Sequence, residues 1–344
     1  MPLWLDCNQV LKETSQGLFC PDGGFYVDPW QPVDRALLTH AHGDHARPGS
    51  AAYLCTPQTV PLLRRRFGPD AVLESLPYGQ TMSIGSVRVS FHPAGHVLGA
   101  AQIRIEGAEG VWVVAGDYKR AADPTCEPFE PVRCDTFITE STFGLPIYRW
   151  DPTSVVMADI LSWWSANRDA GKTSVIFCYT VGKAQRLLAE LARVSDTPVY
   201  VHGMLTGMIE GYREAGVMLP EVRQVIERTG GRKSEKVSLA GQLVLAPLSA
   251  RGTLWMRRLG THSDAFASGL MRVRGVRRQR AYDKGFVISD HADWPALLQT
   301  ISETGASRVL ATHGYAEPLA RHLRSHGLDS GIIRTAWEGE PSGD

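Results

Sequence analysis

The chain has 344 residues, of which 43% are hydrophobic and 21% are charged. This composition is typical of a folded globular protein with room for two cores, and it excludes a chain that is disordered over most of its length. Lysine plus arginine equals aspartate plus glutamate, at 36 each, so the net charge does not indicate an anionic partner and any basic surface must be local.

The cysteines and the N-terminus indicate the compartment. Six cysteines occur without a CxxC pair or a dense framework, which favours free, mostly buried thiols in a reducing environment: Cys7, Cys20, Cys55, Cys126, Cys134 and Cys178. The first residues contain no basic segment followed by a long apolar core, and no run of about 18 apolar residues is present. We therefore expect a cytoplasmic protein that is neither exported nor anchored in a membrane.

The chain opens with sheet. Short apolar runs alternate with turn residues over residues 3–28, and Asp22-Gly23-Gly24 predicts a hairpin turn between two strands. Asp28 follows the second of these strands, just before Pro29. A carboxylate at that place can orient a neighbouring metal-binding loop, or it can simply cap a turn.

The next segment contains a dense group of metal-ligand side chains. Residues 36–39 are expected to end a buried strand, and the six residues that follow include three imidazoles and one carboxylate: His40, His42, Asp44 and His45. Imidazole and carboxylate together are the ligands that suit zinc and similar first-row ions. We expect His40 and His42 to bind one ion together, and Asp44 and His45 to point toward a second.

Further ligand-type side chains follow later strands. A helix is expected over residues 57–67, and strands over 81–84, 87–92, 111–116 and 136–139. His96 follows one of these strands in a turn with glycines. The apolar run before Asp117 is typical of a strand buried on both faces, and a carboxylate at its end can bridge two cations. Glu140 ends the last strand of the set.

The pattern changes at about residue 146. Helices then alternate with buried strands up to about residue 283, which predicts a small doubly wound α/β unit. The expected helices are 153–164, 181–194 and 208–215, and the expected strands are 174–178, 199–202 and 243–246. Thr180 and Lys183, at a strand-to-helix turn, are candidate ligands for a terminal phosphate. Ser249 and Arg251, just past the last strand, are similar candidates.

After Lys284 the first pattern returns. A strand over residues 285–289 leads to His291, and a strand over 308–312 leads to His313. A helix is expected near residues 317–325, and the tail after Trp337 is expected to be frayed. The chain therefore divides into a first domain over residues 1–146, an inserted domain over 147–283, and a return to the first domain over 284–344.

These side chains describe a two-metal hydrolase site. Two trios of ligands share Asp117: His40, His42 and His96 form one, and Asp44, His45 and His313 form the other. Two cations about 3.5 to 4 Å apart can hold a bridging water as hydroxide and stabilise charge on a phosphoryl or carbonyl oxygen. A phosphodiester also benefits from an acid that protonates the departing alkoxide. His291 paired with Glu140 can supply that acid, because the carboxylate favours the protonated imidazole.

These motifs resemble a known family. Residues 40–45 with His96 and Asp117 resemble the metallo-β-lactamase superfamily. Three further motifs resemble those of its β-CASP nuclease branch: Glu140, His291 and His313. The resemblance spans nearly the whole chain. It implies a four-layer αββα metallo-β-lactamase sandwich made from both ends of the chain, with the inserted α/β segment as a β-CASP cap domain.

Within this branch, residues 178–183 and 287–293 are most similar to the bacterial DNA-ligase-associated exonucleases. That resemblance implies a metal-dependent DNA exonuclease in repair or end processing, with an ATP-dependent DNA ligase and a helicase as partners. It also implies two divalent ions, zinc first and manganese or iron as alternatives. The pre-messenger-RNA cleavage endonucleases share the main motifs, so an RNA-processing endonuclease or exonuclease is the alternative.

One tract of the chain is strongly basic. Between Arg251 and Lys284 there are nine arginines or lysines against two acids, with Trp255, Phe266 and Tyr282 interleaved. A groove that follows phosphates and stacks bases requires this mixture, although a solvated basic face has the same composition. A non-catalytic scaffold would lack some metal ligands, and none is missing. A small-thioester hydrolase would need neither the insert nor the basic tract.

Overall fold

The computed structural model describes residues 9–225 and 238–334, so the tail expected to fray lies outside the described residues. The chain forms two compact units. The first contains the residues up to Pro146 together with those from His291 onward, and the second contains Ile147–Asp290. No described helix is long and apolar enough to cross a membrane.

One sheet of the first unit comes from the start of the chain. Its strands, in spatial order, are β1 (Lys12–Thr14), β2 (Gly17–Cys20), β3 (Phe25–Val27), β4 (Arg35–Leu37), β5 (Ala52–Cys55) and β6 (Leu73–Ser75). The predicted hairpin is confirmed, because β2 and β3 pair antiparallel with Leu18 opposite Val27. Helix α1 (Val60–Phe67) packs against this sheet through Phe67, whose ring centroid lies 4.9 Å from that of Tyr53.

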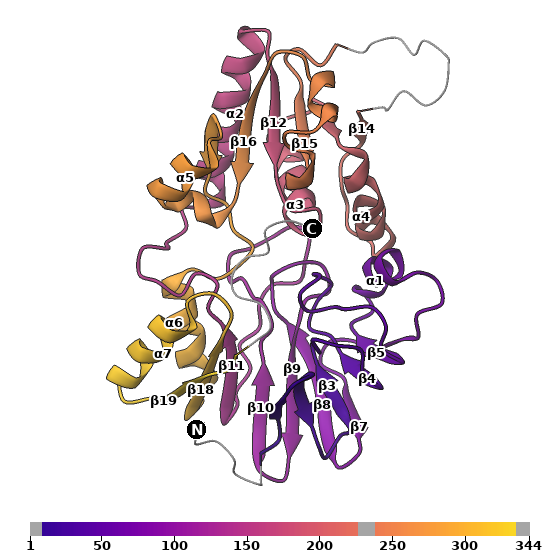
Figure 1. Ribbon diagram of the computed structural model, residues 1–344, viewed down its shortest axis with the longest axis vertical. Helices are drawn as coiled ribbons and strands as arrows, with labels where there is room; N and C mark the ends of the chain where they lie inside the picture. The colour runs from indigo at the N-terminus through magenta and orange to yellow at the C-terminus, as the bar shows by residue number, and fades with distance from the viewer. Residues whose placement is uncertain (1–8, 226–237, 335–344) are drawn as a thin grey trace. The chain divides into compact units, whose positions relative to one another are not determined.

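The second sheet of this unit joins both ends of the chain. Its strands are β19 (Asp329–Ile332), β18 (Arg308–Thr312), β11 (Thr136–Glu140), β10 (Gly110–Val114), β9 (Ala101–Gly107), β8 (Val87–Pro93) and β7 (Thr81–Ile84), in that spatial order (Figure 1). β18 runs parallel to β11, with Thr312 opposite Glu140. The C-terminal segment therefore completes a sheet that the N-terminal segment began.

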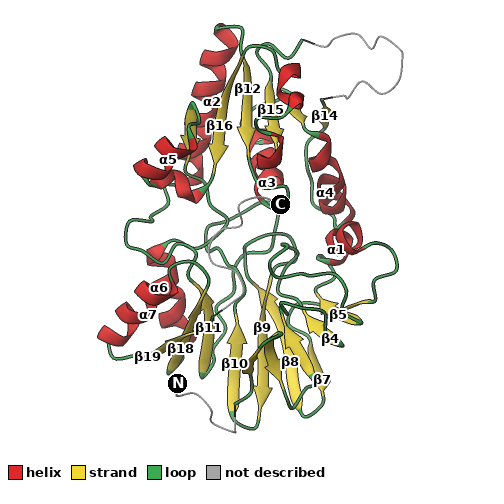
Figure 2. Cartoon of the chain, in the orientation of Figure 1, coloured by secondary structure: helices red, strands yellow, loops and turns green. Residues whose placement is uncertain are grey.

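The two sheets face each other across a hydrophobic core. Phe25 and Leu37 of the first sheet pack with Ile103 and Val114 of the second. Helices α6 (Trp294–Thr304) and α7 (Ala316–Ser325) cover the other face of the second sheet, where Leu297 and Leu323 contact Phe137 and Val309 (Figure 2). With α1 on the far side, the layers are the expected αββα sandwich.

The second unit is an α/β unit with one parallel sheet, as predicted. The strands, in spatial order, are β14 (Val222–Gln224), β13 (Val199–Val201), β15 (Leu243–Ala246), β12 (Thr173–Phe177), β16 (His262–Ala267) and β17 (Lys284–Phe286). Helices α2 (Thr153–Asp169), α3 (Lys183–Ala192) and α4 (Gly203–Glu214) bury their apolar sides on one face. The other face is covered by short pieces: η1 (Leu248–Ala250), η2 (Leu254–Arg258), η3 (Gly269–Arg272) and α5 (Arg274–Arg280).

The structure differs from the sequence-based expectation at two boundaries. Helix α4 begins at Gly203 rather than Met208, because the ring Nδ1 of His202 accepts a hydrogen bond from the amide of Met204 at 3.1 Å and caps the helix. Strand β17 pairs with β16, with Gly285 opposite Phe266. Residues 284–290 therefore belong to the second unit, and the chain returns to the first unit at His291 rather than at Lys284.

The thiols agree with the expected free state. The cysteines of the described residues are free, and all but Cys126 are buried. Cys7 lies outside the described residues.

Candidate metal centre

The ends of β4, β8, β10, β11 and β18, with the segment before α6, bring the ligand-type side chains of the first unit together. Three groups form, each with ligand atoms within 4.8 Å of one another. The groups are His40, His42, His96 and Asp117; then His45, Asp117 and His313; then Asp117, Glu140 and His291. Asp117 belongs to all three groups, as the expectation of a bridging carboxylate requires.

Distances place the Asp117 carboxylate between the two expected trios. Its Oδ2 lies 3.6 Å from Nε2 of His40 and 3.5 Å from Nε2 of His45. His42 completes the first group, with its Nδ1 3.1 Å from Nε2 of His40 and 3.0 Å from Nε2 of His96. His96 and Asp117 are far in the sequence from the loop that carries His40, His42 and His45, so the fold of the first unit assembles the site.

The second group contains polar atoms without partners. Nε2 of His45 and Oδ1 of Asp44 are both buried and make no hydrogen bond within the described residues. Oδ2 of Asp44 lies 3.9 Å from Nε2 of His45, so Asp44 is adjacent to this group although it lies outside the 4.8 Å set. A cavity of about 40 Å³ lies beside them and is also lined by Asp28 and His313. Since buried polar atoms rarely remain unsatisfied, these residues fit a divalent cation.

Asp28 contacts the metal-ligand loop directly. Its Oδ2 lies 2.7 Å from Nδ1 of His45, and its Oδ1 accepts a hydrogen bond from the amide of Thr39 at 2.8 Å. The backbone of Asp28 is left-handed, with φ at +44°, a conformation that costs energy for a residue other than glycine. Of the two interpretations of Asp28, these contacts favour the one in which it orients the loop.

His313 is held in a similar way. Its φ is +56°, again left-handed. The hydroxyl of Ser141 donates to the carbonyls of Thr312 and His313, which ties the end of β18 to the end of β11. The neighbouring Gly314 approaches this segment so closely that an added Cβ would lie 2.5 Å from Cα of Thr142. The strained backbone is therefore stabilised by tertiary contacts on both sides.

The expected pair of His291 and Glu140 is formed. Nδ1 of His291 lies 3.0 Å from Oε2 of Glu140, and Oε1 accepts a hydrogen bond from the amide of Tyr118 at 2.8 Å. Burial opposes ionisation of Glu140, but the charge of His291 and the hydrogen bond between the two lower the pKa of the carboxyl below its usual value. Glu140 is therefore an ionised acceptor that fixes the imidazole through Nδ1.

Burial governs the protonation of the imidazoles. It lowers the pKa of His40 well below the usual value, and the neighbouring imidazoles, His45 first, add to the effect. Burial and the charge of His45 lower the pKa of His313 to about 4. A neutral imidazole is the form that binds a metal ion, so both rings are prepared for ligation at neutral pH.

The acidic side chains act in the opposite sense on His45. Burial alone would lower the pKa of His45, but Asp117, Asp44 and Asp28 together raise it to about 10. Burial raises the pKa of Asp117 to about 7. The ionised form of a carboxylate that is so deeply buried is stabilised by a nearby positive charge, and a divalent ion provides one.

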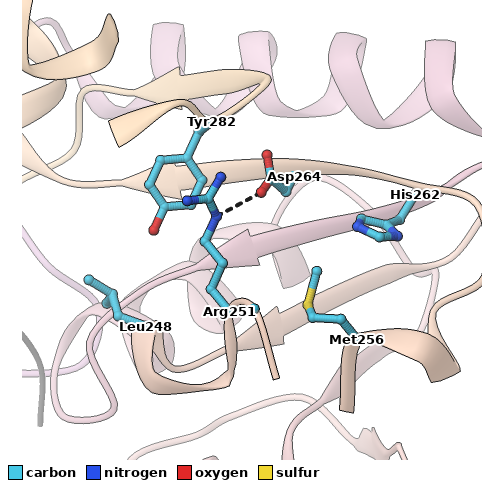
Figure 3. Close-up of a pocket in the computed structure, with 7 residues that line it drawn as sticks. Leu248, Arg251, Met256, His262, Asp264 and Tyr282 are labelled. Atoms are coloured by element: carbon cyan, nitrogen blue, oxygen red, sulfur yellow. Dashed lines mark hydrogen bonds and ion pairs between the residues drawn. The ribbon is translucent and has the colours of Figure 1, made fainter. Parts of the chain in front are cut away.

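The candidate substrate ligands Thr180, Lys183, Ser249 and Arg251 lie in the second unit, and the structure changes the interpretation of two of them. Lys183 is 1% exposed, and its ammonium lies 2.9 Å from Oδ2 of Asp290. Arg251 places Nε 2.9 Å from Oδ2 of Asp264 (Figure 3). Both cations are thus engaged in ion pairs within the second unit. Thr180 is buried, whereas Ser249 is exposed.

Two residues that support the ligand loops, Arg66 and Lys119, are not among those predicted from the sequence. Arg66 of α1 donates to the carbonyl of Ala41 at 2.6 Å and to that of Ala46 at 3.1 Å, so it holds both ends of the loop that carries His42 and His45. Lys119, buried in an ion pair with Asp123, donates to the carbonyl of His96 at 3.4 Å. The only visible sign was the basic run of residues 64–66, which does not indicate its partners.

The αββα sandwich and these histidine and aspartate groups define a metal centre of the metallo-β-lactamase type. A crystal structure of a protein of unknown function from Enterococcus faecalis V583 has the same fold, with a TM-score of 0.59 and 12% identity, over 90% of this chain and 81% of that chain. No protein-family model matches the sequence.

Similarity in sequence to curated relatives identifies the family more narrowly. The chain is 32% identical over 321 residues to a probable DNA ligase of Opitutus terrae, a match that covers 93% of this chain and 30% of that protein. It is 33% identical over 169 residues to Endoribonuclease YSH1 of Gibberella zeae, covering 48% of this chain and 19% of that one. It is 26% identical over 236 residues to Ribonuclease TTHA0252 of Thermus thermophilus, covering 60% and 53%.

The chain therefore spans only 30%, 19% and 53% of the lengths of these three relatives. It belongs to the metallo-β-lactamase superfamily, in the β-CASP nuclease branch. Divalent metal ions are implied by this family, and the histidine and aspartate groups supply their ligands.

Proposed function

We propose that the protein is a metal-dependent phosphodiesterase that degrades DNA from an end, in repair or end processing alongside a DNA ligase. The observation that carries the proposal is the buried His291–Glu140 pair, at 3.0 Å, in one cluster with Asp117. A phosphodiester loses an alkoxide, which is a poor leaving group, so its departure benefits from protonation by such an acid.

Two groups of residues would hold the metal ions. His40, His42, His96 and Asp117 would hold one, and Asp117, His45 and His313, with Asp44 beside them, would hold the other. We propose zinc, with manganese or iron as alternatives for the same ligands. Bound ions would supply stabilisation of charge on the phosphoryl oxygens and a lowered pKa of water.

His291 would act as the general acid. Glu140 fixes its ring through Nδ1, so Nε2 is the atom that would carry a proton to the departing oxygen. The ring of Phe143 packs edge-on against the imidazole with centroids 5.8 Å apart, which restricts the ring further. The negative charge of Glu140 favours the protonated form of the imidazole, and the contacts of this carboxylate with Tyr118 and His291 hold it in place.

One relative, matched over 93% of this chain, supports DNA as the substrate. The match that covers most of this chain is to a protein named a probable DNA ligase, and it occupies 30% of that protein. The presence of a similar segment within a ligase polypeptide supports a role in processing DNA ends. An ATP-dependent ligase and, by family resemblance, a helicase are the proposed partners. RNA processing is the second candidate, because two relatives are named an endoribonuclease and a ribonuclease. Thr180 and Ser249 are the remaining proposed substrate contacts, and the cytoplasm is the proposed location.

One digestion experiment tests the substrate and the metal together. DNA and RNA of identical sequence, each labelled at either end and carrying a 5′ or 3′ phosphate, are incubated with the purified chain and Zn²⁺, Mn²⁺ or Fe²⁺. We expect stepwise release of nucleotides from one end of the DNA. Faster cleavage of the RNA would support the second candidate, and absence of cleavage of both with every ion would contradict the proposal.

A further inference from the structure

The structure divides the basic tract between Arg251 and Lys284 into two sets. Four cations are used in contacts within the second unit, and they are Arg251, Arg272, Arg280 and Lys284. Arg272 lies 3.2 Å from Asp151, and Lys284 lies 2.9 Å from Asp159. The guanidinium of Arg280 lies over the ring of Phe266, 5.3 Å from its centroid. These charges are therefore not available as a continuous basic groove.

The second set includes three arginines on one helix. Arg274, Arg277 and Arg278 of α5 are exposed, and none of their side chains has a hydrogen bond or an ion pair within residues 9–225 and 238–334. Their spacing of three and four residues places them on the same face of the helix. They form a compact patch, which we call the α5 arginine face.

Contacts on the opposite side fix the direction of this face. Val276 packs in the hydrophobic cluster that contains Phe266 and Met271, and Arg280 lies over the same phenylalanine ring. At 100° per residue, Val276 lies roughly opposite the three exposed arginines, whereas Arg280, three residues after Arg277, lies at the edge of their face. The helix is therefore attached to the unit through Val276. The three arginines remain exposed, and the side chain of Arg277 lies beside Gly285 of β17, where an added Cβ would be 3.2 Å from its Nε.

Arg251 holds the C-terminal end of α5 in place. Its Nη1 donates to the carbonyl of Arg280 at 3.1 Å, and its Nη2 donates to the carbonyl of Ala281 at 2.7 Å. Its guanidinium also lies 3.9 Å from the centroid of the Tyr282 ring, beside the ion pair with Asp264 (Figure 3). Ala281 has a left-handed backbone, with φ at +50°. The cation in this position satisfies the carbonyls that a helix leaves free at its end.

The sequence of α5 would not form a stable helix by itself. Seven residues are too few for a stable isolated helix, and like charges three and four residues apart destabilise it further. The Arg251 contacts and the Val276 packing compensate for this. A fold that stabilises a helix with three unneutralised arginines on its outer face keeps a concentrated positive charge in a fixed geometry.

We propose that the α5 arginine face binds the phosphate backbone of a nucleic acid, independently of base sequence. The planar guanidinium has the fork geometry that matches phosphate oxygens, and no acidic residue lies within α5. This assignment rests on the proposed function, because the nucleic acid bound here is the substrate. None of the three arginines belongs to the groups that form the metal centre.

Salt-dependent binding tests the proposal. The full chain is treated with a chelator so that it does not cleave, and its affinity for a labelled DNA duplex is measured by fluorescence anisotropy over a range of salt concentrations. In the triple variant R274Q/R277Q/R278Q, we expect the slope of log K against log salt to fall by about 2 to 3 units, and binding in 0.1 M salt to weaken by at least about tenfold. An unchanged slope would overturn the proposal.

Two matched variants separate the face from a general effect of charge. R168Q/K172Q/R193Q removes three positive charges from exposed positions elsewhere in the same unit, and we expect it to keep the original slope. R274K/R277K/R278K keeps the charges and should keep most of the slope. An equal loss in the first control, or a full loss in the lysine variant, would overturn the assignment. Polyglutamate that binds as tightly as DNA of equal charge would also overturn it.

The outcomes separate this inference from the proposed function. Because binding is measured without metal, a chain that cleaves neither DNA nor RNA can still show the fall in slope, and then only the proposed function fails. A chain that cleaves DNA while the triple variant keeps its slope contradicts only the α5 arginine face. If the triple variant does not fold, the single variants R274Q, R277Q and R278Q decide, each with an expected fall of about 0.9 unit.

Discussion

Oδ2 of Asp28 lies 2.7 Å from Nδ1 of His45, and this contact joins the end of β3 to the loop that follows β4. The carboxylate selects which ring nitrogen of His45 is turned toward Asp117. A carboxylate behind a metal-ligating histidine commonly raises its affinity and fixes its ring. The strained backbone of Asp28 is therefore explained by the position that its side chain must reach.

We expect Asp28→Asn to weaken metal binding at the group of His45 and His313 by about 10- to 100-fold, because the ring of His45 loses its charged acceptor. The group of His40, His42 and His96 should keep its ion. Titration with metal and a competing chelator measures the two affinities. Asp34→Asn, at an exposed position on a neighbouring loop, is the matched control, and equal affinities in both variants would contradict this role of Asp28.

His291→Ala should reduce cleavage by about 10²- to 10⁴-fold while the bound metal is retained, because the imidazole acts as an acid and completes neither ligand trio. Glu140→Gln should have an effect in the same direction, since the amide no longer favours the protonated ring. Turnover and metal content are measured on the same preparations. Full activity of His291→Ala with its metal present would exclude the imidazole as the general acid.

The carboxylate of Asp290 forms ion pairs with two buried cations, Lys183 at 2.9 Å and Arg186 at 3.2 Å. Asp290→Ala should destabilise the second unit by about 3 to 5 kcal/mol, because it leaves two buried charges without their carboxylate. Urea unfolding measures the loss, and Arg193→Ala, an exposed site 67% accessible at its side chain, should change stability by less than about 0.5 kcal/mol. If Lys183→Met left stability unchanged but weakened binding of DNA with a terminal phosphate, the sequence-based role of Lys183 would be correct.

Gly116 precedes the shared carboxylate and has φ at +57°, and an added Cβ would lie 2.6 Å from Cβ of Thr39. Gly116→Ala should therefore destabilise the first unit by about 2 kcal/mol or more and displace Asp117, with loss of bound metal. Gly216→Ala is the matched control, because its φ is +88° and no atom lies within 4 Å of the added Cβ. Only the backbone strain, about 1 kcal/mol, should be measured there.

Burial raises the pKa of Cys55 to about 12. Because the unfolded thiol ionises near pH 8.5, the folded state binds this proton more tightly, so its contribution to stability is complete below pH 8.5 and is lost as pH rises toward 12. The free energy of unfolding should therefore fall more steeply with pH in the unaltered chain than in Cys55→Ala, by about 1.4 kcal/mol per pH unit above pH 9. Denaturant titrations at pH 7, 9 and 10 measure this, and parallel curves would contradict it.

Local signals accounted for the elements that sequence analysis predicted correctly. The hairpin between β2 and β3 has its own turn residues, and β10 contains the continuous apolar run that precedes Asp117. The elements that were missed depend on non-local contacts. Strand β16 lies within the basic tract. Its three C-terminal residues are buried in a sheet whose other strands come from elsewhere in the chain. The sheet to which β17 belongs is likewise decided by its partner and not by its composition.

The sequence by itself determined the kinds of ligand and their order, because each histidine or carboxylate follows an apolar strand and that relation is local. Only the tertiary structure decided that Asp117 lies between both trios, that Asp28 supports His45, and that Arg66 holds the loop. It also decided which cations of the basic tract are neutralised. An ion pair such as that of Arg272 with Asp151 depends on distance in space, and the spacing of residues along the chain carries no information about that distance.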